Sequence, residues 1–168
     1  MQDHEGAQRP MDHEAVITAG PLMARYEPLI GSWRTAGEIL DEHGESAGRI
    51  QGWDLYDRLG DSFVIHRVSV DMDGQQVQAV EVIGPELGAN TAATRAFGHD
   101  GSEETSTSVV AADRVFTFGS EGARARMEIA EDGTTGSAFW ERSDDDGATW
   151  WPWMRLRFTR EPDYPFLP

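Results

Sequence analysis

Residues 134–160, TTGSAFWERSDDDGATWWPWMRLRFTR, carry the strongest indication of the fold. Two runs rich in aromatic residues flank a short acidic segment, residues 143–150, of the form S-x-D-x-G-x-T-W. Ser and Asp side chains can hydrogen-bond nearby backbone groups in such a turn, and Gly147 can adopt a positive φ. The stretch therefore predicts a β-hairpin. Its four tryptophans make it either a ligand-contacting segment or a structural hairpin that closes a barrel: Trp140, Trp150, Trp151 and Trp153.

Turn signals recur at short, regular intervals along the rest of the chain. Between them we expect strands over residues 31–41, 48–59, 62–71, 75–83, 91–98, 104–111, 114–119, 123–130, 134–142 and 150–160. Successive short hairpins favour a single all-β, antiparallel, up-and-down barrel of about ten strands, because closure removes exposed edges. We expect a short helix over residues 21–30 and a loop over residues 84–88. The barrel domain is predicted over residues 21–160, between a flexible tail at 1–20 and an irregular tail at 161–168.

Composition excludes several functions. The formal charge of −16 disfavours nucleic acid and anionic membrane surfaces as partners. All fourteen basic residues are Arg, so lysine chemistry and a P-loop are excluded, and the absence of Cys removes thiolate ligands and nucleophiles. We therefore expect no metal site. The first residues show no apolar signal segment, which predicts a cytoplasmic protein.

Five segments resemble, in order and spacing, a bacterial domain-of-unknown-function family of small calycin-like barrels. They are residues 29–33 (LIGSW), 52–56 (GWDLY), 66–70 (HRVSV), 81–84 (EVIG) and 143–154 (SDDDGATWWPWM). The resemblance implies a closed barrel with a cavity, related in shape to lipocalins, fatty-acid-binding proteins and nitrobindins, and distantly to barrel polyketide cyclases. Trp33 resembles the lipocalin G-x-W tryptophan at the barrel base. Residues 143–150 resemble the Asp-box of sialidase propellers, but the motif occurs once, which argues against a propeller.

Nitrobindins hold haem through an axial His near the C-terminus. No His follows His99 in this chain, so residues 100–168 lack that ligand. We therefore expect no haem and no other cofactor.

Alternation along the strands predicts which side chains enter a cavity. If Arg67 and Ser69 face water, His66 and Val68 face inward, and the same argument places Glu81 inside on the next strand. His66 and Glu81 would then form a polar pair that orients a ligand or exchanges a proton, with Tyr56 donating to a carbonyl. The alternative is a hydrogen-bonded core histidine whose partner is that carboxylate.

A second group of candidate ligand contacts comes from later strands. Arg95, Phe97 and His99 share one strand face and could line the barrel mouth, with Arg95 binding a carboxylate; the alternative is an outward charged face. Aromatic and sulfur-containing side chains could contact an apolar ligand or serve as packing, and these candidates are Trp53, Trp140, Trp153 and Met154.

Two functions of different classes remain open. The first is a barrel that binds a small, largely apolar organic molecule in its cavity, as a carrier or binding module. The second is a cofactor-independent cyclase or isomerase, for example of Diels–Alder type, acting on a polyketide-like substrate inside the barrel. A filled core with a structural role, and a homodimer, are also left open.

Overall fold

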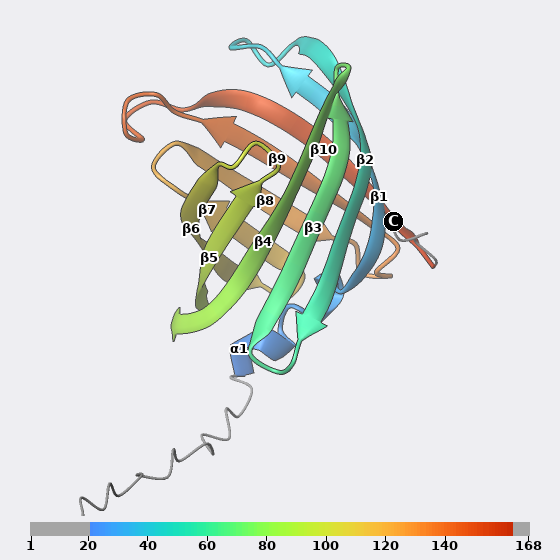
Figure 1. Ribbon diagram of the computed structural model, residues 1–168, viewed down its shortest axis with the longest axis vertical. Helices are drawn as coiled ribbons and strands as arrows, with labels where there is room; N and C mark the ends of the chain where they lie inside the picture. The colour runs from blue at the N-terminus through green and yellow to red at the C-terminus, as the bar shows by residue number, and fades with distance from the viewer. Residues whose placement is uncertain (1–20, 163–168) are drawn as a thin grey trace, which may run out of the picture.

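The chain folds into a closed antiparallel barrel with one short helical segment at its base (Figure 1). The computed structural model describes residues 21–162. Each strand pairs with its neighbours in sequence, and β1 pairs with β10 to close the barrel. This confirms the predicted fold class. The predicted tail at 1–20, and residues 163–168 of the predicted C-terminal tail, lie outside the described residues.

The described residues form ten strands whose bounds follow the predicted turn signals closely. They are β1 Gly31–Leu40, β2 Ser46–Leu59, β3 Phe63–Met72, β4 Gln75–Gly88, β5 Thr91–Gly98, β6 Glu103–Ala112, β7 Val115–Gly119, β8 Ala123–Ile129, β9 Thr135–Arg142 and β10 Trp151–Glu161.

Inward and outward side chains alternate along the strands, as the sequence pattern predicts. On β8, Ala125, Met127 and Ile129 are buried, whereas Arg124 and Arg126 lie on the outer wall. Because the side-chain period of a strand is two, one buried position fixes the orientation of the whole strand. The same reasoning places most of the inner residues that form the cavity described below.

The N-terminal segment closes one end of the barrel. Helix α1 spans Pro21–Ala24 and the 3₁₀ turn η1 spans Glu27–Leu29. Pro28 lies at the start of η1, where its missing N–H costs nothing, so the expected helix over residues 21–30 is divided into two single turns. Tyr26 and Leu29 are fully buried, and Tyr26 stacks on Phe116 at 5.4 Å between ring centroids. The segment therefore acts as a plug.

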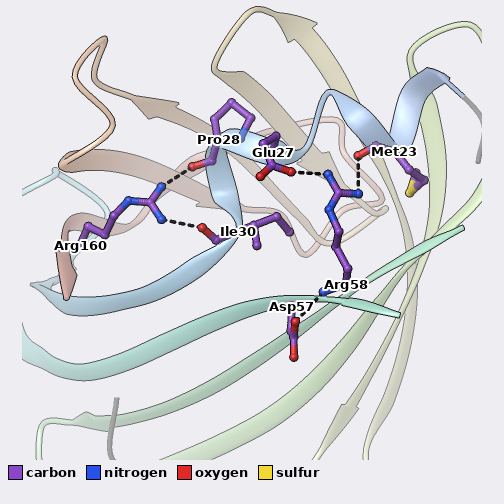
Figure 2. Close-up of polar contacts among 7 residues, drawn as sticks. All are labelled: Met23, Glu27, Pro28, Ile30, Asp57, Arg58 and Arg160. Atoms are coloured by element: carbon purple, nitrogen blue, oxygen red, sulfur yellow. Dashed lines mark hydrogen bonds and ion pairs between the residues drawn. The ribbon is translucent and has the colours of Figure 1, made fainter. Parts of the chain in front are cut away.

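Arg160 fastens this plug to the last strand (Figure 2). Its guanidinium donates hydrogen bonds to the carbonyl oxygens of Pro28 at 2.9 Å, Ile30 at 2.5 Å and Gly133 at 2.7 Å. The same group lies 4.1 Å from the ring centroid of Trp33. Trp33 is fully buried, which agrees with its predicted place at the barrel base.

A second arginine holds the plug from another strand. Arg58 at the end of β2 donates to the carbonyl oxygen of Met23 at 3.5 Å and forms an ion pair with Glu27 (Figure 2). The two arginines thus attach the N-terminal segment to strands on both sides of β1.

The expected loop at 84–88 is wrong, because β4 continues through it to Gly88. The pairing of β4 with β5 shifts register between Ile83 and Glu86, so the strand carries an irregularity where Pro85 stands. A β-bulge tolerates a residue that cannot donate to the ladder, and Gly84 supplies a φ of 125°. Gly84 and Pro85 therefore mark a bend within β4 and not a loop between two strands.

The acidic turn between β9 and β10 is held by its own side chains. Thr149 donates to Asp145 through its backbone N–H at 2.8 Å and its hydroxyl at 2.6 Å. The Ser143 hydroxyl donates to Asp145 at 2.7 Å and accepts from the N–H of Gly147 at 2.9 Å. The indole of Trp150 donates to the Gly147 carbonyl at 2.9 Å. The predicted turn chemistry is therefore present.

Candidate functional site

A cavity of about 830 Å³ occupies the interior of the barrel above the plug. Its lining extends to the hairpins β3–β4, β5–β6 and β7–β8, which lie at the end away from α1 (Figure 1). Small side chains such as Ala96, Ala125 and Ala138 leave the space open, because larger residues at inward positions would fill it.

The cavity floor carries a polar cluster on three adjacent strands. Tyr56 of β2, His66 of β3 and Glu81 of β4 stand side by side in register. His66 Nε2 lies 2.6 Å from Asp54 Oδ1, and His66 Nδ1 lies 3.2 Å from Glu81 Oε2. The Thr35 hydroxyl donates to the other oxygen of Asp54. Both ring nitrogens of His66 thus face a carboxylate.

These contacts decide the charge of His66. Burial lowers the pKa of an imidazole, but the hydrogen bonds to Asp54 and Glu81 and their charges outweigh burial and raise the pKa of His66 to about 9. At neutral pH the ring is an imidazolium that donates from both nitrogens. His66 is therefore a positioning group between two carboxylates, and it has no free nitrogen with which to accept a proton.

Tyr56 covers the histidine ring. The two rings are stacked in parallel, with centroids 4.1 Å apart and planes 3° from parallel. Only 4% of Tyr56 is exposed. Burial, followed by the charges of Asp54 and Glu81, raises the pKa of the phenol well above its ordinary value. Within residues 21–162 its hydroxyl has no hydrogen-bond partner, so the cavity floor presents a neutral phenol able to donate to a ligand.

The wall formed by β9 and β10 is mainly apolar. Trp140 and Trp153 meet edge to face with ring centroids 6.1 Å apart, and Met154 and Leu156 continue the wall. Trp153 and Met154 are consecutive, yet both line the cavity, because the β9–β10 register shifts between Pro152 and Met154. Val68 adds an apolar contact from β3.

Three predicted ligand contacts lie on the outer wall, which corrects their predicted placement. Arg95 is exposed and forms an ion pair with Glu103, and Phe97 beside it is 43% exposed. Thr94 is fully buried, so its neighbour Arg95 must face outward. Trp53 faces outward for the same reason, since Asp54 after it faces inward.

His99 follows the last residue of β5 and lies at the cavity rim. Its side chain shares a contact of 3.2 Å with the backbone of Gln78. It lines both the cavity and the outer hollow that Trp53 and Phe97 border. Of the three predicted contacts Arg95, Phe97 and His99, only His99 lines the cavity. Ala96 and Gly98 line it from the opposite face of β5.

Asp54 and Thr35 were missed at the level of sequence. Asp54 stands two residues before Tyr56 on one strand, so the alternation that places Tyr56 inside also places Asp54 inside. Asp54 is 6% exposed, and a buried carboxylate requires a partner. The need for a partner could therefore have predicted the contact between Asp54 and His66 from the sequence.

The described residues contain no group of three or more His, Asp or Glu side chains arranged to hold a metal ion. Among them, too, no helix has the length and apolar character needed to cross a membrane.

No protein-family model matches the chain, and no curated protein matches its sequence. Similar solved structures include a redesigned β-barrel, mFAP1, bound to DFHBI, at 12% identity and a TM-score of 0.47, with 81% of this chain and 98% of that chain covered. Another is EF1p2_mFAP2b bound to DFHBI, at 11% identity and a TM-score of 0.44, with 83% and 99% covered. Both are distant likenesses.

Proposed function

We propose that this chain is a calycin-like barrel that binds a small, largely apolar organic molecule in its central cavity. The observation that carries the proposal is the cavity itself, about 830 Å³ in volume, which lies within the range of roughly 300–1,000 Å³ typical of ligand pockets. A filled structural core would leave no such space.

The lining suggests how a ligand would be oriented. The apolar part would lie against Trp140, Trp153 and Met154, where burial of apolar area supplies most of the binding free energy. A polar group would meet the phenol of Tyr56 on the floor. A few polar groups in a largely apolar pocket are the usual source of orientation and specificity.

The test combines discovery of the ligand with a block of the cavity. Native mass spectrometry of protein purified from its own host is expected to show a bound small molecule. Ala96→Phe, which fills the cavity from β5, should lose that molecule, whereas Arg95→Phe, which adds the same ring on the outer wall, should retain it. Equal retention by both variants would refute binding inside the barrel.

A second function is favoured by Glu81 and Tyr56, which line the cavity on either side of His66. One oxygen of Glu81 is held by His66, and within residues 21–162 the other accepts no hydrogen bond. A carboxylate base and a neutral phenol donor that line one cavity suit an isomerase or cyclase, because the base removes a proton next to a carbonyl and the phenol donates to the developing enolate.

Deuterium exchange into 2-tetralone in D₂O tests this second function. The wild-type protein should accelerate exchange at the position next to the carbonyl, and Glu81→Gln and Tyr56→Phe should each reduce the rate by about 100-fold, the scale of general acid–base catalysis. An unchanged rate in Glu81→Gln would exclude this carboxylate as the base.

A further inference from the structure

The cavity has an unusual balance of charged groups. Four carboxylates line it, those of Asp54, Glu81, Asp100 and Glu104, but among the described residues no arginine does. Because every basic residue other than His is Arg in this chain, the cavity can draw positive charge only from its histidines. The outward placement of Arg95 removes the one arginine that the sequence suggested for the site.

The polar floor keeps a net negative charge. His66 carries one positive charge and lies between two carboxylates, so the three groups sum to −1. Asp54 is satisfied by Thr35 and His66, but Glu81 has one oxygen that accepts no hydrogen bond within residues 21–162. Glu81 is largely buried, so its uncompensated charge lies in a region of low dielectric.

Two further features face the same space. Tyr56 lines the cavity beside this cluster, and its hydroxyl has no hydrogen-bond partner among the described residues. The edge-to-face pair of Trp140 and Trp153 lines the same cavity. Indole faces attract organic cations, with Trp the strongest of the aromatic side chains.

Resting on the proposed function, we propose that the ligand is an organic cation with an apolar body, whose protonated amine lies against Glu81 and Tyr56 on the cavity floor. The ammonium would donate to the open carboxylate oxygen and to the phenol oxygen, while the apolar body packs against the tryptophans. A fatty acid or other carboxylate is excluded, since its charge would be buried beside a net negative cluster with no arginine to pair it.

A matched series of probes tests the charge of the ligand on the wild-type protein. The probes are 2-(1-naphthyl)ethylamine, 2-(1-naphthyl)ethanol and 1-naphthylacetate, which share one ring system and differ in charge. Isothermal titration calorimetry at neutral pH should show the amine binding about tenfold more tightly than the alcohol. The acetate should show no binding.

Glu81→Gln then locates the effect. This variant should reduce the preference for the amine over the alcohol to less than about twofold. Glu103→Gln removes the same charge from the outer wall, where Glu103 pairs with Arg95, and should keep the tenfold preference. Unchanged preference in Glu81→Gln would overturn the assignment of Glu81.

The outcomes separate the two proposals. Equal binding of amine and alcohol, or tighter binding of the acetate, would overturn the cationic ligand while the cavity remains a binding site. Failure of all three probes to bind would overturn the proposed function and the cationic ligand with it. The wild-type series decides these points even if a variant fails to fold.

Discussion

His66 is a buried cation held between Asp54 and Glu81, so the stability of the protein depends on its protonation. Its pKa is raised from the ordinary 6.5 to about 9 in the folded chain. Because the folded protein binds this proton more tightly than the unfolded chain, His66 stabilises the folded protein fully below pH 6.5. This contribution is lost as the pH rises from 6.5 through 9. We expect the free energy of unfolding to fall across that window by up to about 3 kcal/mol. Urea unfolding at a series of pH values measures it.

The matched control for this pH dependence is His66→Gln, which removes the titrating group. In that variant the decline between pH 6.5 and 9 should disappear, although its stability at neutral pH is lower. An NMR titration of the imidazole in the wild-type protein gives the pKa directly. A midpoint near the ordinary 6.5 would show that the two carboxylates do not hold the proton.

The sequence predicts some residues of the site and misses others for a common physical reason. Alternation places His66, Val68 and Glu81 correctly, because each strand has buried neighbours that fix its phase. The same rule would have placed Asp54 inside and Arg95 outside. The sequence analysis placed Arg95 at the barrel mouth because an arginine suits a carboxylate ligand, and it did not consider Asp54, whose burial depends on its contact with His66.

At the scale of the element, the turn between β9 and β10 depends on one of its three aspartates. Hydrogen bonds from Thr149, first through its hydroxyl and then through its backbone N–H, lower the pKa of Asp145 to about 2. Asp145→Ala removes these bonds, so hydrogen exchange of the Thr149 amide should accelerate about tenfold or more. Exchange measured by NMR checks this.

Asp144 provides the control for that turn. It lies next to Asp145, is exposed and has no hydrogen bond or ion pair among the described residues. Asp144→Ala should leave the Thr149 amide protected. If both variants lose protection equally, the turn responds to charge in general and the Asp145 bonds do not hold it.

Two glycines on different strands test how closely the barrel wall is packed. A Cβ at Gly52 of β2 would overlap the Ser69 carbonyl oxygen and lie 2.5 Å from Cα of Val70, so the backbone of β3 must move. We expect Gly52→Ala to lower the free energy of unfolding by about 2 kcal/mol. Thermal and urea unfolding measure the change.

Gly119 of β7 is the matched control, since a Cβ there meets nothing within 4 Å. Gly119→Ala should be neutral or stabilise by about 0.5 kcal/mol, because alanine reduces the freedom of the unfolded chain. Equal destabilisation by both substitutions would mean that strand flexibility, and not the close approach of β2 to β3, sets the cost.

Element boundaries were predicted well where turns use local chemistry, as in the hairpin at Asp73 and Gly74. Both residues adopt positive φ there, which Asp and Gly favour. The 84–88 segment was misassigned because Gly84 and Pro85 also allow a bend inside a strand. Whether residues 84–88 form a loop or a bent strand depends on the pairing of β4 with β5. This pairing is a long-range contact that the local sequence does not indicate.

At the scale of the whole molecule, barrel closure joins the first and last strands, and Arg160 couples that closure to the plug. Its guanidinium binds carbonyl groups from Pro28, Ile30 and Gly133 and covers Trp33. Arg160→Ala leaves those carbonyl groups without their donor and opens the base of the barrel. We expect the free energy of unfolding to fall by about 3 kcal/mol, since hydrogen bonds from a charged donor are among the stronger ones.

Arg157→Ala is the control for Arg160, because Arg157 also lies on β10 but is exposed and bonds to no other described side chain. Its replacement should change stability by less than about 0.5 kcal/mol.

In Arg160→Ala, hydrogen exchange should accelerate first in β1 and β10, because the closing pair loses its anchor to the plug. Arg160→Lys keeps the charge but cannot reach three carbonyl groups in one plane, so its stability should be intermediate. If Arg160→Ala and Arg157→Ala unfold at the same urea concentration, Arg160 does not hold the plug, and the burial of Tyr26 and Leu29 together with the contacts of Arg58 is sufficient.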